Sequence, residues 1–135
     1  MIRDLIRKNR SYRRFHQNFI IDSKTLLDLI DLARLTASSA NKQPLRFKIV
    51  NQPQENERVF SCLSWAGYLT DWQGPEEGEK PSAYIIVLTD KTISPNPQFD
   101  VGLACQSILM GAVEEDLGGC LFGSVKKDKL RDKFK

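Results

Sequence analysis

Residues 100–124, DVGLACQSILMGAVEEDLGGCLFGS, combine an apolar helix pattern with the stop that ends it. Apolar and small side chains recur at helical spacing from Asp100 to Val113, which predicts a largely buried helix. Leu117-Gly118-Gly119 is typical of a helix end, and Cys120 to Phe122 then predicts a short strand. This stretch therefore predicts a helix that packs in the core, followed by a short strand that joins a sheet.

Two further strands are predicted upstream of this helix. Residues 83–89 (AYIIVLT) form a nearly continuous apolar run, which is typical of a strand at the centre of a sheet. In residues 45–49, Leu45, Phe47 and Ile49 alternate with basic residues, which predicts a half-buried strand. Three strands among several helices allow a small α/β fold or an α+β fold.

The remaining periodic segments predict helices. One begins after Met1 and ends near Asn9, and a basic amphipathic helix ends the chain. A helix capped by Asp22 or Ser23 should bury one face, made of Leu26, Leu27, Ile30 and Ala33. A helix that begins at Pro53 should carry Trp65 and bury the face made of Val59, Cys62, Leu63 and Ala66.

Length and composition limit the classes of protein. The 135 residues are 41% hydrophobic and 27% charged, so we expect one globular domain over 1–135. No apolar run reaches the roughly 20 residues of a membrane helix, and no secretory signal opens the sequence. Three widely spaced cysteines favour a reducing cytoplasm over a disulfide framework. A single histidine and the lack of C-x-x-C leave no zinc site.

Three segments could carry chemistry, although each is also compatible with an ordinary turn. Residues 10–15 (RSYRRF) place guanidinium groups beside a hydroxyl, a combination that suits a phosphate. Residues 37–44 (ASSANKQP) offer hydroxyl, amide and amine groups beside small residues. Residues 117–124 (LGGCLFGS) place glycines on both sides of a short apolar run, so a flat ligand could approach the backbone. Neither a dinucleotide fingerprint nor a P-loop is present.

The order of these segments resembles that of the nitroreductase family of flavin-dependent oxidoreductases. The matching features are Arg-Ser-x-Arg, Ser-x-x-Asn-x-Gln-Pro, the strand after Pro81, the helix led by Asp100, and Leu-Gly-x-Cys-x-x-Gly. The resemblance implies an α+β fold with a central, mainly antiparallel sheet flanked by helices. It also implies an intertwined homodimer that binds one FMN at each of two sites across the interface. Residues 1–135 would then be a single FMN-binding domain without the family's usual C-terminal strand and arm.

The resemblance also implies roles for individual residues. Arg10 and Ser11 would face the FMN phosphate and ribityl chain, and Arg13 would lie near the pyrimidine edge of the flavin. The segment that reaches the flavin of the other subunit contains Ser38, Ser39, Asn41 and Gln43. A third segment would run beside the ring, with a backbone N–H near N5, and contains Leu121, Phe122 and Gly123. No metal is expected.

The function implied is the NAD(P)H-dependent reduction of a nitroaromatic, a quinone or another conjugated small molecule by a ping-pong mechanism. Because the flavin carries the chemistry, the absence of a nucleophile–base pair is no objection. Trp72 and Tyr68 are candidates for the substrate pocket, since aromatic rings stack on flat acceptors. The alternatives are an FMN-binding protein without turnover and a small nucleic-acid binder. A net charge of only +3 disfavours nucleic acid as a partner.

Overall fold

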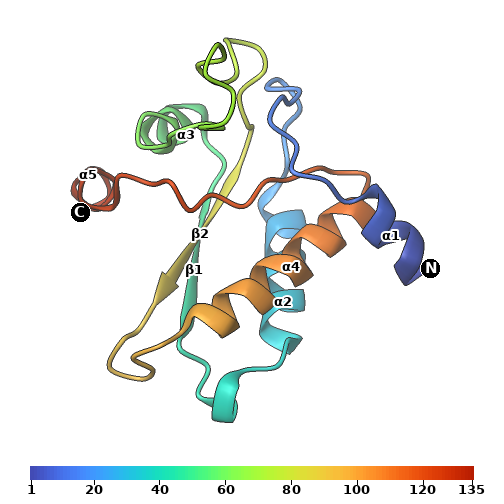
Figure 1. The fold of residues 1–135 in the computed structure, drawn as a ribbon, viewed down its shortest axis with the longest axis vertical. Helices are drawn as coiled ribbons and strands as arrows, with labels where there is room; N and C mark the ends of the chain where they lie inside the picture. Colours follow the sequence, from blue (N-terminus) through green and yellow to red (C-terminus); the bar gives the residue numbers. More distant parts are fainter.

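The computed structural model describes all residues, 1–135. Its elements are α1 (Ile2–Lys8), α2 (Ser23–Leu35), the short 3-10 helix η1 (Ser39–Asn41), β1 (Leu45–Val50), α3 (Pro53–Phe60), β2 (Tyr84–Thr89), α4 (Gln98–Glu114) and α5 (Lys127–Lys133). Both α1 and α2 pack against α4, while α3 packs against α5. Figure 1 shows the strands running between the α2–α4 pair on one side and α3 with α5 on the other.

The sheet consists of β1 and β2, which pair in an antiparallel register with Leu45 opposite Thr89 and Val50 opposite Tyr84. Both strands were predicted from their patterns. Residues 83–89 were predicted to form a central strand. Within one chain this is wrong, since the sheet has only β1 and β2 and each strand has one neighbour. β2 is therefore half-exposed along its length, in spite of its apolar sequence.

The third predicted strand, Cys120 to Phe122, does not form. The chain here makes only two isolated bridges, Ser11 with Gly119 and Leu63 with Val125. Residues 120–122 run between the Gly119 bridge and the Val125 bridge and extend neither of them. The segment is therefore an extended connection whose ends are held by different parts of the chain.

Helix α2 begins as predicted, because the Asp22 carboxylate accepts a hydrogen bond of 2.7 Å from the Thr25 N–H. Its buried residues are Leu26, Leu29 and Ala33, which lie on the side facing α4. The prediction that Leu27 belongs to this face is wrong, since Leu27 is 56% exposed. The helical period places Leu29, rather than Leu27, between the two helices.

Leu29→Ala is expected to lower the free energy of unfolding by about 3 kcal/mol, because it leaves a cavity between α2 and α4. Leu27→Ala, the same change two residues earlier, should lower it by less than about 1 kcal/mol. Urea unfolding of the two variants tests this assignment. Equal losses would contradict the packing described.

Candidate functional site

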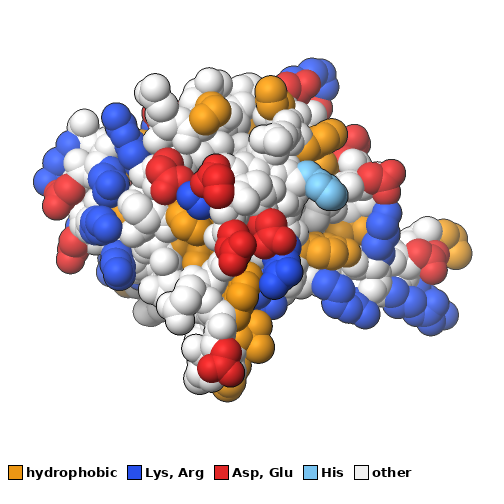
Figure 2. Space-filling model, turned by 90° about the horizontal axis from the view of Figure 1, so that it is seen from above, with side chains coloured by type: hydrophobic (Ala, Val, Ile, Leu, Met, Phe, Trp, Pro, Cys, Tyr) orange, Lys and Arg blue, Asp and Glu red, His pale blue; other side chains and the backbone are white.

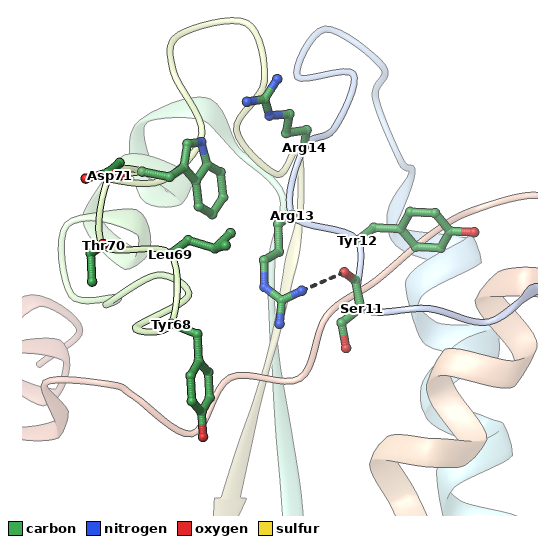
Figure 3. Close-up of a pocket in the computed structure, with 9 residues that line it drawn as sticks. Ser11, Tyr12, Arg13, Arg14, Tyr68, Leu69, Thr70 and Asp71 are labelled. Carbon is green, nitrogen blue, oxygen red and sulfur yellow. Dashed lines mark hydrogen bonds between the residues drawn. The ribbon is translucent and has the colours of Figure 1, made fainter.

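Residues 10–14, which follow α1, are extended and are held by contacts with Lys8 and with residues 118–119. The Tyr12 N–H donates to the Gly119 carbonyl over 3.1 Å, and Tyr12 Oη donates to the Lys8 carbonyl over 3.0 Å. The Tyr12 ring lies against Gly118, where a Cβ would come within 2.6 Å of a ring carbon. In an extended chain, successive side chains alternate in direction. Ser11 and Arg13 accordingly point away from Tyr12, and the Arg13 guanidinium turns back to the Ser11 carbonyl (Figure 3).

An open cavity of about 770 Å³ lies between this segment and that loop. Residues 11–14 line one side and residues 68–72 line the other. The structure thus brings two predicted cofactor ligands, Ser11 and Arg13, to the same cavity as Tyr68 and Trp72, the predicted substrate contacts (Figure 3). Tyr68 is fully exposed, so its ring is available to a ligand.

The loop that carries Tyr68 and Trp72 is hydrogen-bonded, at residues 78 and 79, to Phe15 and Gln17. The Phe15 N–H donates to the Glu79 carbonyl over 2.9 Å, and the Gly78 N–H donates to Gln17 Oε1 over 2.7 Å. Lys80 forms ion pairs with Glu77 and Glu57 at 2.9 and 3.0 Å, and hydrogen bonds to these carboxylates raise the pKa of Lys80. The loop and the arginine segment are therefore fixed to each other.

The arginines of the segment differ in what balances their charge. Arg14 forms an ion pair with Glu79 at 3.7 Å and lies over the Trp72 ring at 5.9 Å. Arg10 and Arg13 form no ion pair; Arg10 Nη1 donates to the Ile6 and Asn9 carbonyls, and Arg13 Nη1 donates to the Ser11 carbonyl. Two guanidinium groups without a carboxylate partner are suited to bind an anion.

Residues 121–123 lie between the two halves of this region. Gly119 pairs with Ser11, and the Ser64 N–H donates to the Ser124 carbonyl over 3.0 Å. The backbone N–H groups of residues 121–123 donate to no acceptor within the chain. The Phe122 ring is half-buried and packs edge-on against Trp65, at 4.5 Å between centroids.

The prediction that Trp65 lies on a helix is wrong, because α3 ends at Phe60. Its ring contacts Phe60, Trp72 and Phe122 in a cluster behind the cavity. Gly74 is required beside it, since a Cβ there would lie 2.9 Å from the indole ring. Trp65 is therefore a half-buried packing residue in a loop.

The second predicted group lies elsewhere in the chain. Ser38, Ser39, Asn41 and Gln43 belong to the turn between α2 and β1, and Ser38 contacts Asp100 in the first turn of α4. Ser11 pairs with Gly119, beyond the other end of α4. The 17 residues of α4 span about 25 Å. Figure 1 shows the two groups at opposite ends of the helix pair, so one chain does not bring them together.

Sequence reasoning identified Asp100 only as the start of the predicted helix and missed its contact with Ser38; Asp100 is only 5% exposed. The available signal was an acidic residue leading an apolar helix. No group of three or more His, Cys, Asp or Glu side chains is placed to hold a metal ion. None of the helices combines the length and apolar character needed to cross a membrane.

Comparison with known proteins identifies the family. The model of the nitroreductase family matches residues 6–135. A nitroreductase family protein from Clostridium novyi NT has 22% identity and a TM-score of 0.79, with 98% of this chain and 74% of that one covered. A protein of Exiguobacterium sibiricum 255-15 solved in complex with FMN has 16% identity and a TM-score of 0.77, with 99% and 80% covered. A Staphylococcus epidermidis ATCC 12228 protein assigned as an NAD(P)H:FMN oxidoreductase has 15% identity and a TM-score of 0.77, with 99% and 78% covered.

No curated protein sequence matches the chain. The solved structures share too little sequence to indicate more than the fold, which is the α+β, nitroreductase-like fold expected. The family model spans nearly the whole chain, in the order of elements just described. The protein belongs to the nitroreductase family.

Proposed function

We propose that the protein is an FMN-dependent oxidoreductase that uses NAD(P)H to reduce a nitroaromatic, a quinone or another conjugated small molecule by a ping-pong mechanism. Membership of the nitroreductase family supports an oxidoreductase. The FMN complex of one structural relative and the NAD(P)H:FMN assignment of another support the cofactor and the reductant. Residues 1–135 would act as one FMN-binding domain, and three free cysteines are compatible with a cytoplasmic location.

The observation that carries the proposal is Arg13. Its guanidinium has no carboxylate partner and lies beside Ser11 at a cavity bordered by Tyr68 and Trp72. A planar, anionic ligand would supply the missing negative charge and would stack on the aromatic side chains. The residues present therefore fit FMN, whose isoalloxazine ring is flat, has carbonyl oxygens at its pyrimidine edge and becomes negatively charged there on reduction.

Each group would then have a separate task. Arg10 and Ser11 would hold the phosphate and the ribityl chain, while Arg13 would stabilise the negative charge that reduction places at the pyrimidine edge. The free N–H groups of residues 121–123 would border the ring. Bound FMN would supply the hydride and electron transfer, and the protein would orient the reactants. The open side of the cavity would let nicotinamide leave before the acceptor enters.

The active form would be a homodimer with two shared sites. The two groups of predicted ligands lie at opposite ends of α4, so a second copy would have to supply one of them. The surface also has apolar side chains that a partner would cover: Phe99 is 80% exposed, Leu35 is 66% exposed and Ile2 is 61% exposed. Exposed apolar surface of this kind is typical of subunit interfaces.

Two other functions are less well supported. An FMN-binding protein without turnover would use the same residues and would differ only in its kinetics. A nucleic-acid binder needs a continuous basic surface. Figure 2 shows Lys and Arg gathered at two separate sides of one face, toward α5 and toward α1, with Asp and Glu between them.

The test is FMN titration of the purified protein, followed by its reduction with NADH or NADPH. We expect one FMN per subunit, and bleaching of the flavin absorbance that added quinone or nitroaromatic reverses. Absence of FMN binding would contradict the proposal. Binding without nicotinamide oxidation would favour the alternative of a flavin carrier.

A further inference from the structure

Asp100 is a buried carboxylate without an ion pair. It is 5% exposed and lies in the first turn of α4. Oδ2 accepts a hydrogen bond from the Ser38 hydroxyl, and Oδ1 accepts one of 3.1 Å from the Ser39 N–H. A buried carboxylate is unfavourable unless hydrogen bonds satisfy it, and both of these come from one turn.

Ser38 links the two ends of that turn. Its hydroxyl donates to Asp100 and accepts a hydrogen bond of 2.9 Å from the Gln43 N–H. A serine hydroxyl has a single hydrogen to donate. Since Asp100 takes it, Ser38 has no donor left for a phosphate or for a flavin oxygen.

The backbone between Ser38 and Gln43 needs such support. Ala40, Asn41 and Gln43 have φ angles of 49°, 52° and 53°. This left-handed region is unfavourable for residues that carry a Cβ, so the surrounding contacts have to maintain it. The contacts of Asp100 and Ser38 close the turn around these three residues.

Besides the exposed Lys42 ammonium, two side chains in the turn have free donors, Ser39 and Asn41. The Gln43 side-chain amide donates to Asn41 Oδ1 over 2.6 Å, which orients the Asn41 amide and leaves its Nδ2 without an acceptor in the chain. The Ser39 hydroxyl also makes no hydrogen bond within the chain, and both residues are exposed. Ser38 therefore faces inward to Asp100, whereas the side chains of Ser39 and Asn41 are exposed.

We propose that Asp100 is a positioning residue for the cofactor: with Ser38 it holds the 38–43 turn so that Ser39 and Asn41 face the flavin, and Ser38 is not itself a ligand. This inference rests on the proposed function and revises the predicted role of Ser38. It assigns the binding task of the turn to the Ser39 hydroxyl and the Asn41 amide.

The first test uses the flavin-free protein and measures amide hydrogen exchange. Asp100→Ala and Ser38→Ala should each speed exchange at Ser39 and Gln43 by about tenfold or more, because those N–H groups lose their order or their acceptors. Asp100→Asn should be milder than Asp100→Ala, because the amide oxygen can still accept the Ser39 N–H. A role confined to helix-terminal charge would make the two Asp100 variants alike and would overturn the inference.

The second test measures FMN dissociation constants. Asp100→Ala and Ser38→Ala should each weaken binding by about tenfold, and the double variant should be little worse than either, since both act through one turn. The matched control is Ser107→Ala, which removes the 2.6 Å bond between Thr36 and Ser107 of α4 and leaves the turn intact. It should change neither exchange in the turn nor FMN affinity.

The outcomes separate this inference from the proposed function. If Asp100→Ala and Ser38→Ala behave like Ser107→Ala, or if their effects on affinity add fully, the inference is wrong. If the wild-type protein binds no FMN, the proposed function fails, and unchanged exchange at Ser39 and Gln43 would then overturn the positioning role as well. Should Asp100→Ala fail to fold, the Asp100→Asn and Ser38→Ala comparison still decides the question.

Discussion

Arg13→Ala is expected to weaken FMN binding by about a hundredfold, the scale of losing charge-assisted hydrogen bonds. The guanidinium lies at the cavity, forms no ion pair and donates only to the Ser11 carbonyl. Its charge is therefore available to a ligand, and its removal disturbs little else in the fold. Fluorescence titration with FMN measures the loss, and a thermal unfolding curve should show no large change.

The chain offers a matched control in the neighbouring residue. Arg14 lines the same cavity, but its charge is balanced by Glu79 and its guanidinium lies over Trp72. Arg14→Ala should therefore weaken FMN binding by less than about threefold, since an exposed ion pair contributes little. Arg13→Lys should fall between the two alanine variants, because lysine keeps the charge and loses the planar fork. Equal losses in Arg13→Ala and Arg14→Ala would contradict the role given to Arg13.

The elements that the sequence predicts well are those with a strong local pattern. Alternation in β1, the apolar run of β2 and the apolar helix α4 all survive in the structure. The cap at Asp22 also forms, because its hydrogen bond depends only on neighbouring residues. Local periodicity and capping are enough for these elements.

The failures occur where distant segments decide the conformation. The pattern of Val59, Cys62, Leu63 and Ala66 continues a helix, but α3 ends at Phe60. Leu63 pairs instead with Val125, and the Cys62 carbonyl accepts from the Lys126 N–H over 2.9 Å. These contacts lie more than 60 residues away in the chain, so no local pattern reveals them. Residues 120–122 lie between the Gly119 and Val125 bridges and belong to neither.

In the candidate site, too, the sequence predicts local groups of residues but not the contacts between distant ones. Family resemblance named two groups of ligands, but only the structure shows that α4 separates them. It also shows that Ser38 and Ser39, adjacent and chemically alike, contact Asp100 through different groups: Ser38 donates its hydroxyl, whereas Ser39 donates its backbone N–H and keeps its hydroxyl free. Such differences depend on Asp100, which is 61 or 62 residues away from the two serines. Residue type alone could not distinguish them.

Mixed dimers are expected to recover binding that neither parent has. One subunit would carry Arg13→Ala, and the other would carry Ser39→Ala with Asn41→Ala. If each site takes one group from each subunit, all the substitutions fall in one of the two sites and leave the other intact. Mixed dimers isolated by two different affinity tags should then bind one FMN with wild-type affinity. Their NAD(P)H oxidation should be about half that of the wild-type dimer, since one site of two is whole.

The parent proteins show why recovery would be decisive. An Arg13→Ala dimer carrying both tags has the lesion in both sites and should bind FMN as weakly as the untagged variant. A site formed within one chain would be damaged in both subunits of the mixed dimer, so no site of wild-type affinity could appear. Recovery therefore requires that Arg13 of one copy and the 38–43 turn of the other meet at the same flavin. The opposite ends of α4 permit this arrangement between two chains and do not permit it within one.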